Sequence, residues 1–183
     1  KDADSHPISF WAMNSGLFGM LMGFWLHRDD IVAVAGLVVI AAFSSVIYTV
    51  WIRASKARKF SIKESWYYAL SLFCLVGGSA FGEITALGFV PESYGYMRLA
   101  HIHLVVLGFV LLAIIGMMHH ILPTVWNRPF LSPKLAQAAM VVIPLGVAAL
   151  IGGFLNSSVP VELAAGGLLF IGGILWAGNL LGT

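Results

Sequence analysis

Residues 98–123 read RLAHIHLVVLGFVLLAIIGMMHHILP, and this stretch decides the fold. It is apolar apart from its first arginine and two pairs of histidines, and it is long enough to cross a bilayer, which takes about 20 helical residues. His101 and His103 open it. Because imidazole is polar and titrates near neutrality, each ring needs a partner on entering lipid. The stretch therefore predicts a membrane helix with two chemically active side chains at one end.

The spacing of His101 and His103 separates their rings. Successive residues of an α-helix are offset by about 100°, so residues two apart point to nearly opposite faces. One helix can then offer a nitrogen to each of two metal centres. This divergence suits axial ligation of haem, whereas the ligands of a mononuclear zinc site must converge. The alternative is an interfacial pair satisfied by loop carbonyls and water.

The composition is that of an integral membrane protein. Of 183 residues, 60% are hydrophobic and 10% are charged, and the mean hydropathy is +0.93. Soluble domains average about 25% charged residues. We predict an all-α integral membrane protein, with one domain over residues 1–183 in the form of a six-transmembrane-helix bundle. The expected helices lie near residues 9–27, 31–52, 66–86, 99–122, 135–155 and 161–181.

Basic residues predict the orientation. Lys1, the loop 53–64 and the loop after the fourth helix hold eight of the ten Lys and Arg residues. By the positive-inside rule, both termini are expected in the cytoplasm and His101 at the outer side of the cell (inner) membrane. The net charge of +2 comes from these loops and gives no reason to expect nucleic acid as a partner. Residues 1–7 lack the basic start of a signal peptide, so we expect none to be cleaved.

This orientation places His27 on the outer side with His101 and His103. The alternative for His27 is a helix-end residue that faces water. Arg98, one turn before His101, is either a partner for haem propionates or a snorkelling side chain. Glu83, near the outer end of the third helix, could pair with Arg98, contribute to a proton path or be solvated.

On the inner side lie His6, His119 and His120, which are either interfacial residues or ligands of a second haem. His103 and His119 are 16 positions apart, about 24 Å of α-helical rise. The single cysteine, Cys74, is expected to be inert packing. Because the chain has no Cys-x-x-Cys-His motif, any haem is expected to be b-like or modified rather than covalently attached.

Small and polar residues within the predicted spans also carry expectations. The many glycines, such as Gly16 in the first helix and the pair Gly77 and Gly78 in the third, either permit tight helix packing or leave room for a flat macrocycle. Asn14 and Ser15 in the first helix are expected to bond to a neighbouring helix.

The stretch from Leu99 to Pro123 resembles the tenth transmembrane helix of haem–copper oxidase subunit I, which a His-x-His run opens on the outer side. Residues 72–82, LFCLVGGSAFG, are similar to the ninth helix of that family, and residues 10–27 to the seventh. The resemblance covers nearly the whole chain and corresponds to helices seven to twelve. It implies half of a haem–copper-oxidase-like fold.

The resemblance also implies site residues. His101 would be the axial ligand of the high-spin haem, and His103 a ligand of the low-spin haem. In that family a His-His pair after the seventh helix binds copper, whereas here Arg28 follows His27. The remaining copper and haem ligands belong to the N-terminal half of the family's subunit. Copper is therefore not expected.

We predict a haem-b-binding subunit of a membrane respiratory complex, which carries electrons between a quinone or a redox partner such as a cytochrome and another subunit. It would hold one or two haems and have no catalytic residue. His27 and His101 would ligate one iron, and His103 a second haem completed by a partner chain or a second copy. The alternatives are half of a split terminal oxidase or nitric oxide reductase, and a non-redox membrane scaffold or transport-related protein.

Overall fold

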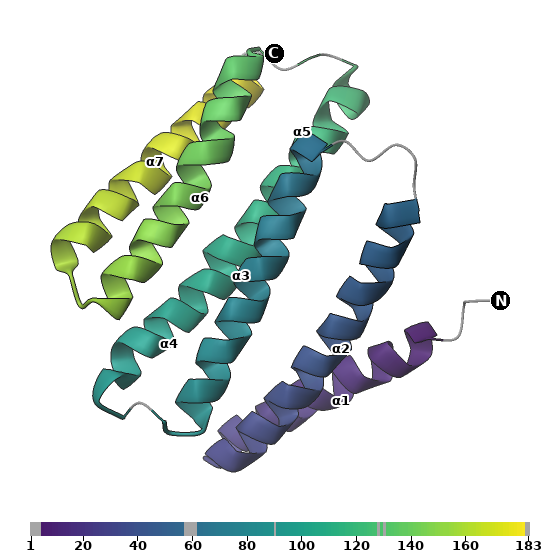
Figure 1. The fold of residues 1–183 in the computed structure, drawn as a ribbon, viewed down its shortest axis with the longest axis vertical. Coiled ribbons are helices and arrows are strands. Elements are labelled where there is room, and N and C mark those ends of the chain that lie inside the picture. The colour runs from purple at the N-terminus through teal and green to yellow at the C-terminus, as the bar shows by residue number, and fades with distance from the viewer. Residues whose placement is uncertain (1–4, 57–61, 90, 128, 130, 182–183) are drawn as a thin grey trace. The chain divides into compact units, whose positions relative to one another are not determined.

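The computed structural model describes residues 5–56, 62–89, 91–127, 129 and 131–181, and within these ranges the chain is all-helical, without a strand. A short 3₁₀ turn, η1 (Pro91–Ser93), and a π-helix, η2 (Leu104–Leu111), separate or join the α-helices. The α-helices are α1 (Ser5–Trp25), α2 (Asp29–Lys56), α3 (Ile62–Ala86), α4 (Tyr94–His103), α5 (Leu112–Trp126), α6 (Pro133–Leu155) and α7 (Val159–Leu181) (Figure 1). The predicted all-α class is confirmed.

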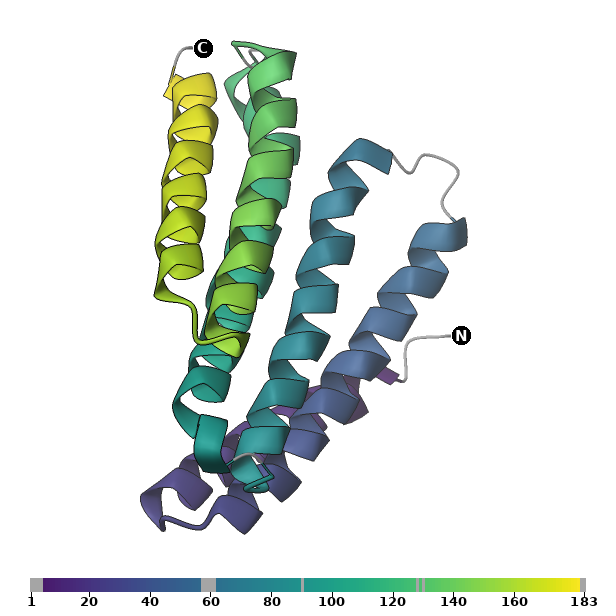
Figure 2. The same cartoon turned by 60° about the vertical axis from the view of Figure 1, so that its left-hand side comes forward.

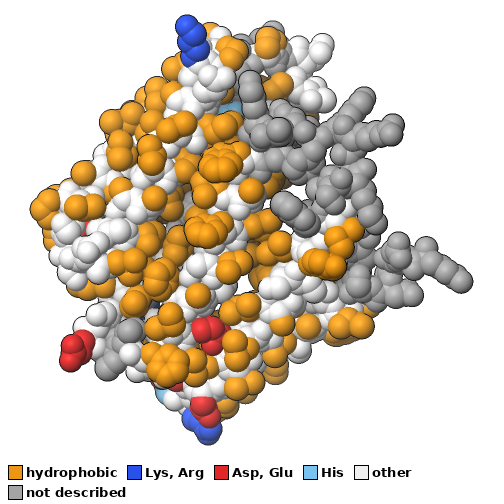
Figure 3. All heavy atoms as spheres, viewed as in Figure 1, with side chains coloured by type: hydrophobic (Ala, Val, Ile, Leu, Met, Phe, Trp, Pro, Cys, Tyr) orange, Lys and Arg blue, Asp and Glu red, His pale blue; other side chains and the backbone are white. Residues whose placement is uncertain are grey.

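Five stretches of the described chain are long and apolar enough to cross a membrane. They are Asp29–Thr49, Trp66–Ala86, Tyr94–Trp126, Pro133–Leu155 and Val159–Leu181. Hydrophobic side chains are spread over much of the described part of the face drawn in Figure 3, and many large apolar residues are exposed. Helix α1 has 21 residues but is not among the five. Five of the six predicted spans thus have the length and composition of transmembrane helices, as in a multi-pass membrane protein.

The polar side chains in the middle of α1 bond within α1. Asn14 Nδ2 donates to the carbonyl four residues earlier at 2.7 Å, and Ser15 Oγ to the carbonyl three residues earlier at 3.1 Å. The prediction that they bond to a neighbouring helix is wrong, because such short side chains reach the carbonyl one turn back. A hydroxyl contact between α1 and α2 is made instead by Ser9 and Ser45, whose Oγ atoms lie 2.7 Å apart.

The chain forms two compact units, which we call the first unit (residues 1–60 and 79–94) and the second unit (residues 61–78 and 95–183). In the first unit, glycines of α1 face α2. A Cβ at Gly16, Gly19 or Gly23 would lie 2.7 to 2.9 Å from an α2 side chain. These glycines therefore serve tight helix packing, one of the two roles predicted for the small residues.

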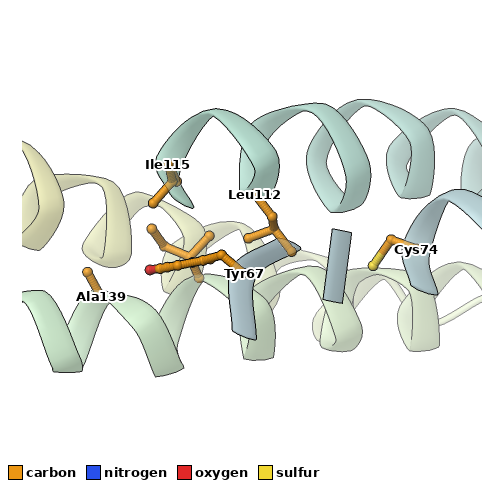
Figure 4. Close-up of a cluster of buried hydrophobic side chains, with 6 residues drawn as sticks. Tyr67, Cys74, Leu112, Ile115 and Ala139 are labelled. Carbon is orange, nitrogen blue, oxygen red and sulfur yellow. The ribbon is translucent and has the colours of Figure 1, made fainter. Parts of the chain in front are cut away.

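The second unit has its core between α3, α5 and α6. The buried side chains of this core are Tyr67, Cys74, Leu112, Ile115, Ala139 and Ile143. The Tyr67 ring lies between α5 and α6, with Ile115 and Ala139 on either side (Figure 4). A Cβ at Gly108 would lie only 2.6 Å from the Cβ of Cys74, so a side chain at this position would push α3 away.

Helices α6 and α7 form an antiparallel hairpin in the second unit (Figure 1 and Figure 2). A short turn at residues 156–158 joins them at one end. At the other end, Asn179 Oδ1 of α7 accepts a hydrogen bond of 2.8 Å from the backbone N–H of Ser132, the residue that caps α6. Asn179 is buried, so this hydrogen bond forms inside the protein.

Helix α4, the π-helix η2 and α5 form one continuous rod from Tyr94 to Trp126. The predicted helix 99–122 is therefore longer at both ends, and it is wrong in being uniformly α-helical. A π-helix bonds residue i to residue i+5. The α-helical rise assumed between His103 and His119 does not apply, because eight of the intervening residues are π-helical.

Two features of the predicted bundle stay predictions. Lys1 and residues 57–61 of the basic loop lie outside the described residues. The inward orientation of that loop rests on the distribution of basic residues in the sequence. The likeness to half of a haem–copper oxidase also rests on sequence motifs.

Candidate functional site

His101 lies on the last turn of α4 and turns its ring toward α3. Its Nδ1 atom is 2.7 Å from the carbonyl oxygen of Gly78. Because a carbonyl can only accept, Nδ1 carries the proton and donates it to this bond. In the neutral imidazole, Nε2 then keeps its lone pair, and a neutral imidazole is the form that binds a metal. The α3 backbone thus fixes both the tautomer and the direction of the ring.

Small residues of α3 make this contact possible. A Cβ at Gly78 would lie 2.9 Å from Val105 Cγ2, so any side chain there would separate the two segments. Ala100, next to His101, is fully buried. Gly78 therefore lets the α3 backbone come within reach of the imidazole, a packing role rather than space for a macrocycle at this position.

The His103 ring also bonds to a backbone carbonyl through Nδ1, but it faces a different helix from His101. Its Nδ1 is 2.8 Å from the carbonyl oxygen of Leu99, one turn back in α4. Its ring packs against the buried ring of Phe154 in α6, with centroids 4.8 Å apart and planes at 50°. His101 and His103 thus leave α4 toward α3 and α6 respectively, which confirms the predicted divergence of the two rings.

His119 of α5 is a third histidine whose Nδ1 atom bonds to a backbone carbonyl. Its Nδ1 is 2.8 Å from the carbonyl oxygen of Ile115, and its ring stacks on Tyr67 of α3 with centroids 5.6 Å apart. The side chain is only 9% exposed, so it lies in the interior of the second unit. The side chains of His6 and His120 lie outside the described residues.

His27 lies in the first unit, in the turn that ends α1. Its φ of 52° is left-handed, and the N–H of Arg28 donates to the carbonyl of Gly23 at 2.9 Å. This is the geometry of a Schellman helix end, in which glycine is the usual left-handed residue. The His27 side chain is exposed. Its backbone therefore has a clear structural role, whatever its ring binds.

The cationic groups near these histidines are both at the surface. Arg98 is exposed on α4, one turn before His101, as predicted from their spacing. Arg28 donates two hydrogen bonds to Asp30, at 2.8 and 2.6 Å, and this pairing raises the pKa of the Arg28 guanidinium. Arg28 is thus engaged with a carboxylate, whereas no such pairing is described for Arg98.

Among the described residues, no group of three or more His, Cys, Asp or Glu side chains is placed to hold a metal ion. Zinc and copper sites need such a group, whereas a haem needs only one or two axial side chains. The sequence did not reveal the partners of the histidine rings: the Gly78 carbonyl, Phe154 and Tyr67. The Gly77-Gly78 pair was the only signal that α3 comes close.

Comparisons of the chain with models of known protein families, with curated proteins and with solved structures found no match. The resemblance to haem–copper oxidase subunit I therefore rests on the sequence motifs alone.

Proposed function

We propose that this chain is a haem-b-binding subunit of a respiratory complex in the cell (inner) membrane, where it carries electrons between a quinone or other redox partner and another subunit. The observation that carries the proposal is the state of His101 and His103. The Nδ1 atom of each ring lies within hydrogen-bond distance of a backbone carbonyl, near the start of a membrane-length segment, which in a neutral imidazole leaves Nε2 for a ligand.

The residues present fit a non-covalent haem. Neutral imidazoles held by a second hydrogen bond are typical axial ligands, and haem b needs no cysteine for attachment. When bound, the haem supplies a one-electron carrier. His101 would hold one haem and His103 a second on the other side of α4. Arg98, exposed one turn earlier, would place a positive charge near the propionates of a haem at this level.

Each haem in this proposal needs a second axial ligand. From the sequence alone, His27 is our candidate for the second ligand of the haem at His101, and a partner subunit or a second copy would complete the haem at His103. Two axial imidazoles leave no open coordination position for oxygen, which favours electron transfer over oxygen reduction.

The visible spectrum and the haem content of the purified protein test this function. The native protein should show a b-type band in its reduced-minus-oxidised spectrum, and His101→Ala and His103→Ala should each lose haem. Ile102→Ala is the matched control, since Ile102 lies between the two histidines and its side chain is exposed. Native protein without haem, or haem content unchanged in both histidine variants, would contradict the proposal.

Metal analysis of the same samples separates the alternatives. Copper or non-haem iron near stoichiometry, together with a copurifying multi-helix chain, would indicate half of a split oxidase or nitric oxide reductase. A native complex without haem or metal would indicate a scaffold or transport-related protein.

A further inference from the structure

Glu83 places a carboxyl group within a membrane-length helix. It lies three residues before the end of α3, inside the span Trp66–Ala86, and its side chain is only partly exposed. Ionisable residues inside membrane spans are rare, because a charge is costly there, and they commonly serve a function. The proposed haem site does not use Glu83, so its position needs another explanation.

The carboxyl group of Glu83 lies against the backbone of α2 at Gly36, which has no side chain. A Cβ at Gly36 would overlap Oε1 of Glu83, so α2 leaves room for the carboxyl only because residue 36 is glycine. The other oxygen, Oε2, is buried and has no hydrogen-bond partner among the described residues. A carboxylate in this position would lack a hydrogen-bond donor at Oε2.

The neighbouring helices α1 and α2 offer no described positive charge that would stabilise a carboxylate at Glu83. The charged or titratable residues of α1, α2 and the turn between them are His6, His27, Arg28, Asp29, Asp30, Tyr48, Arg53 and Lys56. Asp29 lies seven positions before Gly36, about 10 Å along the helix. Arg28 is bound to Asp30, and Tyr48 lies twelve positions after Gly36. The Arg28–Asp30 pair carries no net charge, so the negative charge of α2 nearest to Gly36 outside that pair is Asp29, which favours the neutral acid at Glu83.

We propose that Glu83 is a proton-binding site: a neutral carboxylic acid, seated against Gly36, that releases one proton to water and takes it back. Release leaves a carboxylate and one hydrated proton, so the exchange needs no oxidant or reductant. Membrane proteins use such carboxyl groups to pass protons. This site depends only on α2 and α3, and it does not require bound haem.

Modification by dicyclohexylcarbodiimide tests the protonation state. This apolar reagent adds to protonated carboxyl groups, and mass spectrometry of the digested full-length protein locates the product. We expect modification of Glu83 near neutral pH and a lower yield as the pH rises. We expect none at Glu92, which is exposed to water. Absence of modification at Glu83 near neutral pH would overturn the proposal.

Two glycine variants test the geometry. Gly36→Ala should displace the end of the Glu83 side chain, a flexible group, and reduce the yield severalfold without unfolding the protein. Gly95→Ala is the control, because a Cβ there would meet nothing within 4 Å. Equal yields in native protein and Gly36→Ala would overturn the role of Gly36. The infrared C=O band of a protonated acid should disappear in Glu83→Gln, and its persistence unchanged would also count against Glu83.

The result for Glu83 is independent of the haem spectrum. Modified Glu83 in a protein without haem would contradict the electron-transfer proposal alone, whereas haem without modification would contradict this inference alone.

Discussion

His27 combines a strained backbone with an exposed imidazole. Left-handed φ values cost an L-residue with a side chain about 1 kcal/mol or more relative to glycine. The strain is tolerated because the turn closes α1 with hydrogen bonds from the two residues that follow Leu26. Substitutions of His27 can therefore test the backbone strain and the imidazole ring independently.

We predict that His27→Gly stabilises the haem-free protein by about 1 kcal/mol, because glycine adopts the left-handed conformation without strain. His27→Ala, which keeps a Cβ, should give no such gain. Thermal unfolding in detergent, followed by circular dichroism, measures both. Easier unfolding of His27→Gly would show that the ring itself stabilises the fold. In the haem-loaded protein, both variants should change the spectrum if His27 is an axial ligand.

At the residue scale, the sequence identified His101 and His103 and the divergence of their rings, since both follow from helical geometry. It did not identify what each Nδ1 would bond to. The Gly78 carbonyl comes within reach only after α3 packs against the rod from Tyr94 to Trp126. Tertiary packing of this kind leaves no periodic signal in one helix.

Among the elements, helix positions were more predictable than helix type. The spans expected at residues 135–155 and 161–181 agree with α6 and α7 within two residues at each end. The π-helix at 104–111 was missed, because its apolar side chains are equally compatible with both bonding patterns. The choice between them depends on packing, and Gly108 of this segment packs directly against Cys74.

We predict that Gly108→Ala destabilises the second unit by about 1–3 kcal/mol, the usual cost of overpacking a tight contact. Its new Cβ would meet the Cβ of Cys74, which cannot rotate away. Gly167→Ala in α7 is the control: it has no neighbour within 4 Å and should gain up to about 1 kcal/mol from helix propensity. Unfolding midpoints in detergent measure both, and equal stabilities would argue against close packing of η2 on α3.

The whole molecule was predictable in class because hydropathy follows from composition. Apolar runs of membrane length can be found by counting consecutive apolar residues in the sequence. In the structure, five of the six expected spans are helices long and apolar enough to cross a membrane. The division into two units was not foreseen. It depends on which parts of α3 contact which neighbours, and α3 contributes residues to both units.

We predict that Ser93 faces the outside of the cell and Lys59 the cytoplasm, from the distribution of basic residues. In a Cys74→Ala background, a membrane-impermeant maleimide should label Ser93→Cys in intact cells and Lys59→Cys only after the membrane is broken. The background protein is the control and should stay unlabelled. The reverse pattern would invert the topology and place the two outer histidines on the cytoplasmic side.

The bond between Asn179 and the backbone of Ser132 has a consequence for biogenesis. A tight turn joins α6 and α7 at one end, and this hydrogen bond connects them at the other. The Asn179 side chain satisfies the backbone N–H of Ser132, which would otherwise need a partner at this helix end. We therefore expect α6 and α7 to enter the bilayer together, as one hairpin.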